Sequence, residues 1–317
     1  MQNKLRIVFF GTPEFAATSL AALVNAGHNV VGVVTAVDKP AGRGKKLQPS
    51  AIKQYAEEQG LTLLQPPNLK APAFIDSLRA LNADIHVVVA FRMLPEVVWN
   101  MPPLGTYNVH ASLLPDYRGA APINWAIING ETVTGVTTFK LKHEIDTGNI
   151  LLQSEVPIEE NDTAGSLHDK LMHEGANLLL QSVDLIAAGK INLKPQPKGV
   201  GKHAPKIQKS DCLIKLDQTA EQVRNFIRGM APFPGAFLKI EGSSDQLENW
   251  KVFEVEVTQE PSTKHGLLIQ RDDVAMVSAN DYWLKITTMQ TPGKKRMTST
   301  EFLRGYNGKL DSLTIAQ

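Results

Sequence analysis

Short apolar runs alternate with amphipathic segments through the first 190 residues. Leu5 to Phe10 is almost wholly apolar and runs into Gly11, and Pro13 to Ala26 then carries apolar residues at helical spacing behind a proline. The first run predicts a buried strand and the second a helix, because proline is favoured in the first helical turn. The same alternation predicts strands at 29–37, 61–64, 84–90, 105–110, 133–141 and 150–156, and helices at 49–60, 72–81, 121–129 and 163–188.

This alternation indicates an α/β fold. Strands separated by helices form parallel sheets that are covered on both faces, so we expect a doubly wound, mostly parallel sheet. Such sheets bind their ligands outside the carboxyl ends of the strands. Catalytic residues should therefore lie in the loops that follow strands.

The composition changes after residue 187. Glycines and prolines interrupt any helix, and six lysines occur with no acidic residue between Asp184 and Asp211. We interpret this segment as a basic linker. Past it, one helix at 219–230 precedes short alternating segments at 236–240, 250–257, 266–270 and 282–288, which favours a small β-barrel domain of the OB-like kind. The predicted domains are 1–189 and 210–317, with the linker at 190–209.

Composition narrows the class of protein. The 317 residues suggest about two domains. The 33 basic and 32 acidic residues give a net charge of +1, so a charged partner would have to be recognised by local clusters. A single cysteine, Cys212, rules out an intrachain disulfide. The apolar runs are far shorter than the roughly 20 residues of a membrane span, and no signal peptide is evident, so we expect a cytoplasmic protein without a membrane partner.

Two polar loops are candidates for chemistry. Asn108 and His110 end a predicted strand, and their spacing places both side chains on one face. An amide donor and an imidazole aimed at one ligand could form an oxyanion clamp and a proton relay, but they could also simply hydrogen-bond a neighbouring loop. Asp146, followed by Thr147 and Gly148, is either a turn former or a carboxylate reaching into the same cleft.

Other polar and aromatic residues favour structural roles. His168 and His173 are five residues apart on a predicted helix, a spacing that does not face one metal ion, so we expect surface residues and no metal. Cys212 is expected to pack in the interior. Trp250 and the Phe-Pro pairs near Phe233 are expected to belong to the core.

Three basic patches stand out on the nearly neutral chain. They are the loop at 38–47, the lysine-rich linker, and Lys294, Lys295 and Arg296. A solvated charge run is the ordinary interpretation of each patch. Three of them together favour a phosphate-rich partner.

Several stretches together closely resemble the methionyl-tRNA formyltransferase family. They are Phe9 to Phe15, Gly42 to Leu47, Asn108 to Pro115, Arg118 to Ile123, Asp146 to Gly148, His203 to Ile207 and Ile227 to Ala236. The resemblance covers almost the whole chain and implies a formyltransferase Rossmann-like domain followed by a tRNA-binding domain. It implies transfer of the formyl group of 10-formyltetrahydrofolate to the α-amino group of initiator methionyl-tRNA, for translation initiation. We expect the enzyme to be a monomer.

The resemblance also assigns roles to individual residues. It implies that Asn108, His110 and Asp146 are catalytic. It implies that one loop lines the tetrahydrofolate site, formed by Ser112, Leu113, Leu114 and Pro115. It also implies that three basic side chains contact the tRNA acceptor arm, those of Arg43, Lys45 and Lys46. Two stretches depart from the usual family pattern, Asp116-Tyr117 and Phe91-Arg92-Met93-Leu94.

Two other functions fit parts of the pattern. A formyltransferase acting on glycinamide ribotide or an amino sugar would use the same three catalytic residues, but the ribotide reaction needs only about one domain. A non-catalytic RNA-binding protein on a decayed enzyme fold would not need Asn108, His110 and Asp146 intact.

Overall fold

The computed structural model describes all residues except 1–3, 42–45, 242–246, 307 and 317. The described chain divides into two compact units. The first unit comprises 1–119, 134–157 and 168–203, and the second comprises 120–133, 158–167 and 204–317. The segment 190–203 thus groups with the first unit, and the limits inferred from composition stay a prediction.

One mixed sheet forms the centre of the first unit. Its strand order is β10-β9-β7-β6-β1-β2-β5. The strands are β1 (Arg6–Gly11), β2 (Asn29–Val34), β5 (Leu63–Leu64), β6 (Ile85–Val89), β7 (Thr106–His110), β9 (Val133–Lys140) and β10 (Asn149–Pro157). The pairs from β7 through β6, β1 and β2 to β5 are parallel, and β9 joins β7 in the antiparallel sense. The expected α/β sheet, mostly parallel, is confirmed.

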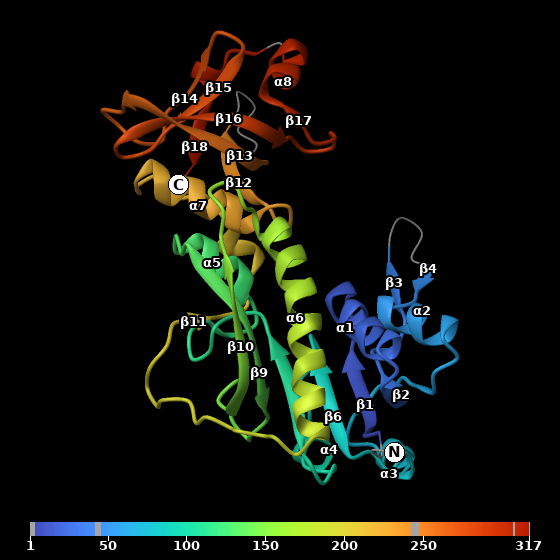
Figure 1. Ribbon diagram of the computed structural model, residues 1–317. Coiled ribbons are helices and arrows are strands. Elements are labelled where there is room, and N and C mark those ends of the chain that lie inside the picture. The colour runs from blue at the N-terminus through green and yellow to red at the C-terminus, as the bar shows by residue number, and fades with distance from the viewer. Residues whose placement is uncertain (1–3, 42–45, 242–246, 307, 317) are drawn as a thin grey trace. The chain divides into compact units, whose positions relative to one another are not determined.

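Helices cover the sheet. They are α1 (Glu14–Asn25), α2 (Ala51–Glu58), α3 (Pro72–Ala80), α4 (Glu96–Trp99) and α6 (Ala164–Ala187). The short helix α4 has no counterpart among the predicted elements, and the helix predicted at 121–129 is α5 (Pro122–Ile128) of the second unit. Figure 1 shows the long helix α6 lying across one face of the sheet. A Cβ atom at Gly175 of α6 would lie 3.3 Å from both Phe15 and Val109, so helix and sheet approach closely there. No helix of the described residues is both long and apolar enough to span a bilayer.

The turn after β1 is tight. A Cβ atom on Gly11 would lie 2.5 Å from the Cβ of Ala16. Only glycine therefore allows α1 to start so close to the end of β1. The predicted second strand ends earlier than expected, at Val34, and the following loop contains the antiparallel pair β3 (Lys39–Ala41) and β4 (Lys46–Gln48).

The second unit is built on a curled antiparallel sheet of the half-barrel type. Its order is β14-β15-β16-β13-β12-β18, with β17 beside β16. The strands are β12 (Ala236–Glu241), β13 (Leu247–Pro261), β14 (Leu268–Arg271), β15 (Val274–Ser278), β16 (Tyr282–Gln290), β17 (Met297–Thr298) and β18 (Thr314–Ala316). The β-rich second domain is confirmed as a fold class. The strand β15 and the helix α8 (Ser299–Gly305) have no counterpart among the predicted elements.

The core of the second unit confirms the predicted burial of Cys212 and Trp250 but does not contain Phe233. Helix α7 (Ala220–Met230) buries Val223 and Ile227 together with Cys212 and Trp250, as expected for the last two. Phe233 is 81% exposed, so the expectation that the Phe-Pro pairs belong to the core is wrong at this residue. Its neighbours are prolines, which favour a loop rather than a strand that could carry the ring inward.

A buried histidine in the first sheet should make stability depend on pH. The side chain of His86 in β6 lies against the ring of Phe10, and its Nδ1 has no hydrogen-bond partner in the described part of the chain. Burial disfavours the charged imidazole and lowers the pKa of His86 from 6.5 to about 4. Between these values the unfolded chain binds the extra proton, so stability is lost as the pH falls.

We expect His86→Phe to remove this dependence. The free energy of unfolding of the wild type should fall below pH 6.5 by up to about 1.4 kcal/mol per pH unit more than that of the variant. Urea unfolding at several pH values between 4.5 and 7.5 measures both slopes. His173→Gln, at an exposed site, is the control and should keep the wild-type slope. Equal slopes for wild type and His86→Phe would refute a neutral His86.

Candidate active site

The carboxyl end of β7 carries the candidate amide and imidazole. β7 lies between β6 and β9, so both of its edges are hydrogen-bonded within the sheet. Val109 faces α6, and the alternation of side chains therefore places Asn108 and His110 on the opposite face. Asn108 is half-buried and His110 is 7% exposed. The strand thus holds both side chains rigidly while leaving them partly accessible.

Both ring nitrogens of His110 face oxygen atoms. Nε2 lies 2.9 Å from the backbone carbonyl oxygen of Tyr117, and Nδ1 lies 3.8 Å from Oδ2 of Asp146. A carbonyl oxygen only accepts, so Nε2 carries a proton and donates it. In the neutral ring Nδ1 is then the unprotonated nitrogen facing the carboxylate, and in the charged ring both nitrogens have an acceptor. Nε2 is thus committed to the Tyr117 carbonyl, whereas Nδ1 faces the carboxylate at a distance longer than a hydrogen bond.

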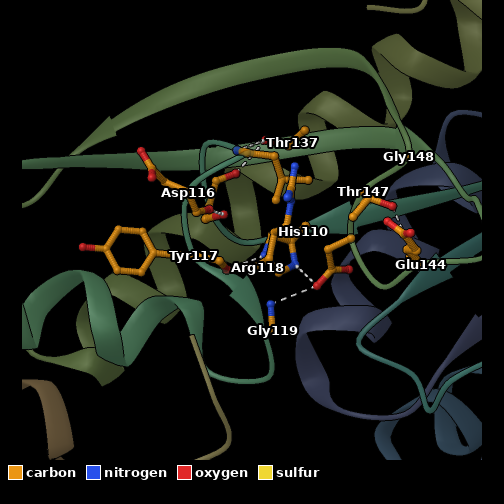
Figure 2. A network of polar contacts seen from close by, with 12 residues as sticks. His110, Asp116, Tyr117, Arg118, Gly119, Thr137, Glu144, Thr147 and Gly148 are labelled. Atoms are coloured by element: carbon orange, nitrogen blue, oxygen red, sulfur yellow. Dashed lines mark hydrogen bonds and ion pairs between the residues drawn. The ribbon is translucent and has the colours of Figure 1, made fainter. Parts of the chain in front are cut away.

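Asp146 comes from the loop between β9 and β10. Its Oδ2 also accepts a hydrogen bond of 3.0 Å from the backbone N–H of Gly119, which Figure 2 marks beside His110. Its side chain is 13% exposed. The backbone of Asp146 has φ 54°, a left-handed conformation that non-glycine residues rarely adopt. The structure therefore brings His110 and Asp146 together, at the cost of local backbone strain.

The loop after β7 is held by its own hydrogen bonds. The hydroxyl of Ser112 donates to the carbonyl of Asp116 at 2.6 Å, and the hydroxyl of Thr137 donates to the carbonyl of Ser112 at 2.6 Å. Gln153 donates to the carbonyl of Leu114 at 2.9 Å. Ser112 and Leu114 are 0% and 3% exposed, whereas Leu113 and Pro115 are half-buried. The alternate residues Leu113 and Pro115 are thus the ones able to contact a ligand.

The two stretches that depart from the family pattern have structural partners. Oδ1 of Asp116 accepts a 2.9 Å hydrogen bond from the backbone N–H of Lys202, whose ammonium lies 5.7 Å from the ring of Tyr117. Figure 2 shows that this ring points away from His110. The guanidinium of Arg92 donates to the carbonyl of Pro67 at 3.0 Å and to that of Pro66. Asp116 and Arg92 therefore each hold another segment of the chain through its backbone.

The basic patches are only partly described. Arg43 and Lys45 lie outside the described residues, and so does the side chain of Lys46. In the second unit Lys294, Lys295 and Arg296 are exposed, with the guanidinium carbon of Arg296 3.6 Å from the centre of the Phe253 ring. Within the described ranges there is no group of three or more metal-binding side chains. His173 is exposed, and His168 packs its ring against Phe15.

Several groups at this site have no signal in the sequence. The carbonyl of Tyr117 and the N–H of Gly119 belong to the backbone, which any residue type would supply. Gln196 donates to the carbonyl of Asp146 at 2.9 Å but comes from the segment interpreted as a linker. A lone glutamine between prolines predicts no contact with a loop fifty positions earlier. Sequence reasoning therefore missed all three.

The chain is similar to known proteins in both sequence and structure. The family model described as formyl transferase matches residues 5–183, and that described as formyl transferase, C-terminal domain, matches residues 206–307. The methionyl-tRNA formyltransferase of Bacteroides fragilis is 49% identical over 312 residues, covering 96% of each chain. That of Flavobacterium johnsoniae is 47% identical over 305 residues, again covering 96% of each chain.

A solved structure shares the fold at much lower identity. The sugar 3N-formyl transferase WlaRD, crystallised with dTDP and 5-N-formyl-THF, superposes with a TM-score of 0.64 at 18% identity. The alignment covers 92% of this chain and all of that one.

The tautomer of His110 can be checked by NMR. In protein with ¹⁵N-labelled histidine, the neutral ring of His110 should be protonated on Nε2, because the Tyr117 carbonyl accepts from that nitrogen. His168 is an internal contrast, since its Nδ1 lies 3.0 Å from the carboxylate of Asp169 and should carry the proton. The His110→Gln variant assigns the signals. A neutral His110 ring protonated on Nδ1 would contradict the geometry described above.

Proposed function

This chain belongs to the methionyl-tRNA formyltransferase family, and we propose that Asn108, His110 and Asp146 catalyse its reaction. The enzyme transfers the formyl group of 10-formyltetrahydrofolate to the α-amino group of methionyl initiator tRNA. The observation that carries the assignment of residues is the position of His110 between the Tyr117 carbonyl and the Asp146 carboxylate, at the carboxyl end of a central strand. Ligands of such sheets bind at that end.

The three side chains have separate tasks in this proposal. The formyl donor supplies an electrophilic carbon, and the α-amino group attacks it in the neutral form, which is accessible near neutral pH because an α-amino pKa is about 7.7 to 8.0. The amide of Asn108 donates a hydrogen bond to the oxygen on which negative charge grows. The Nδ1–H of the protonated His110 ring donates a second one, because Nδ1 lies 3.8 Å from Asp146, beyond hydrogen-bond distance, whereas Nε2 is bonded to the Tyr117 carbonyl. Asp146 orients the imidazolium or a water and helps move the proton from the amine to the departing folate nitrogen, as the bond between that nitrogen and the formyl carbon breaks.

The loop that follows His110 has the apolar side chains that a folate donor could contact. Leu113 and Pro115 offer half-buried apolar surface on the loop that follows His110. His110 comes directly before this loop, and the carboxylate of Asp146 lies 3.8 Å from its ring. We therefore assign the loop from Ser112 to Pro115 to the folate site, with Leu113 and Pro115 in contact and the other two residues supporting them.

The tRNA is assigned to basic residues of both parts of the chain. Arg43, Lys45 and Lys46 would contact the acceptor arm, and the β-rich domain at 210–317 would bind tRNA with help from the linker at 190–209. One chain carries all three catalytic residues, which supports a monomer as the active form. The cytoplasm, where aminoacylated tRNA is found, would be the site of action.

The main competing function is formyl transfer to a small amine. The same three residues would serve it, because the attack on the formyl carbon is chemically the same. Identity of 49% to a methionyl-tRNA formyltransferase across 96% of both chains favours the tRNA substrate. A non-catalytic RNA-binding protein would have no use for the buried pair of His110 and Asp146.

A transfer assay tests the reaction and its catalytic residues. Labelled formyl from 10-formyltetrahydrofolate should appear on methionyl initiator tRNA, and not on free methionine, elongator methionyl-tRNA or glycinamide ribotide. His110→Ala and Asn108→Ala should each slow transfer by about 100-fold or more, since each removes a donor to the developing oxyanion. His173→Ala is the matched histidine control and should keep wild-type activity. Label on a small amine would instead support the competing function.

A salt titration tests the basic loop. Binding of tRNA should weaken with salt by a slope of about −0.7 to −0.9 in log K against log salt for each neutralised phosphate. Replacing Arg43, Lys45 and Lys46 together with alanine should make this slope shallower by about two to three such contributions. Lys70→Ala, an exposed lysine of the first unit, should leave it unchanged. An unaltered slope in the triple variant would refute the loop assignment.

A further inference from the structure

The basic segment after α6 is held by backbone hydrogen bonds to other parts of the first unit, on both sides of Gln196. On one side, Ile150 and Lys194 exchange two backbone hydrogen bonds of 2.8 Å, so the segment is held beside β10. On the other side, the backbone N–H of Tyr117 donates to the carbonyl of Lys202 at 2.6 Å. Gln196 lies between these two attachments and is half-buried. Its position along the segment is therefore fixed by backbone contacts that do not involve its side chain.

The amide group of Gln196 uses its full hydrogen-bonding capacity. Nε2 donates to the carbonyl oxygens of Asp146 at 2.9 Å and of Gly148 at 2.7 Å. Oε1 accepts from Arg118 twice, at 2.6 Å from Nη2 and at 3.1 Å from Nε. An amide has two N–H donors and one oxygen with two lone pairs, so all four bonds are made. A glutamine suits this place because it alone among long side chains combines donors and acceptor in this way.

The two carbonyls that Gln196 binds flank the turn containing the catalytic carboxylate. Asp146 has a left-handed backbone, which costs free energy in a non-glycine residue and persists only where its surroundings enforce it. Gly148 is packed so closely that a Cβ atom would lie 1.8 Å from the carbonyl oxygen of Lys140. The turn is thus held on one side by β9 and on the other by Gln196.

The same amide also holds the loop that carries the other partners of the catalytic groups. Arg118 lies between Tyr117, whose carbonyl accepts from His110, and Gly119, whose N–H donates to Asp146. Figure 2 shows Arg118 and Gly119 beside His110. Gln196 therefore links the two loops that meet at the imidazole, although it does not itself reach the ring.

We infer that Gln196 is a positioning residue for formyl transfer. It fixes the backbone of Asp146 and the side chain of Arg118, and through them it keeps Oδ2 of Asp146 opposite Nδ1 of His110. This inference rests on the proposed catalytic role of the His110–Asp146 pair. It assigns part of the active site to the segment between the two domains predicted from the sequence, where lysines alone had suggested a function.

Two substitutions separate the contacts of Gln196. Gln196→Glu keeps the length and an acceptor for Arg118, but it places an oxygen against the carbonyls of Asp146 and Gly148. Gln196→Met removes all four hydrogen bonds at similar volume. Asn192→Ala removes an exposed amide from the same segment and is the matched control. Displacement of a catalytic group by about 1 Å can cost about 100-fold in rate.

We expect kcat for formyl transfer to fall about 10- to 100-fold in Gln196→Glu and Gln196→Met, with KM for both substrates changed by less than about threefold. Asn192→Ala should match the wild type. In an Asp146→Ala background the Gln196→Glu change should add less than about threefold, because residues that act through one group are not additive. An unchanged kcat, an increase confined to KM, or full additivity with Asp146→Ala would overturn the inference.

NMR of the enzyme without substrates tests the role of Gln196 independently of the proposed function. The ¹⁵N ring signals of His110 should shift in both Gln196 variants and stay in place in Asn192→Ala, whether or not the enzyme formylates tRNA. Absence of transfer by the wild type would refute the function, whereas unshifted His110 signals would refute the role of Gln196. Failure of both Gln196 variants to fold would also overturn the inference, since the residue would then serve stability of the unit alone.

Discussion

The site depends on one imidazole held between a backbone carbonyl and a carboxylate. His110 stands at the end of a central strand, so the sheet fixes its Cα, while the loop after the strand supplies the Tyr117 carbonyl. Asp146 arrives from a different loop and is held in turn by the N–H of Gly119. Each partner limits the motion of the others, and an acid–base group needs such fixed geometry to exchange protons with a substrate.

Backbone strain occurs in three loops that follow strands of the first sheet. Ala90 after β6, Tyr117 after β7 and Asp146 after β9 all have positive φ angles. Strained residues of this kind persist where hydrogen bonds and packing over-determine them, and they cluster at active sites. Gln196 provides such a hydrogen bond to the carbonyl of Asp146, and Tyr117 is held by His110 at its carbonyl and by Lys202 at its N–H. The sheet and these hydrogen bonds together maintain the two strained turns.

The fold and the substrate rest on different observations. A structure that matches this chain with a TM-score of 0.64 is a sugar formyl transferase of only 18% identity, so the fold is shared among enzymes with different amine substrates. One fold commonly hosts several functions, which are decided by its sites. The high identity to methionyl-tRNA formyltransferases, with both domains matched, is what distinguishes the tRNA substrate from a small amine.

The sequence by itself determined the strands of the main sheet and the longer helices of the first unit, the face of β7 that carries Asn108 and His110, and the β-rich character of the second unit. These follow from the periodicity of apolar residues, which is a local property. Tertiary structure decided that Asp146 is a partner of His110, that Phe233 is exposed, and that Gln196 binds the turn of Asp146. The Asp146 loop is held by a backbone N–H from Gly119 and through its own carbonyl by Gln196, and His110 is held by the carbonyl of Tyr117. Backbone groups of this kind are common to nearly all residues, so no residue type in the sequence indicates that these distant loops meet.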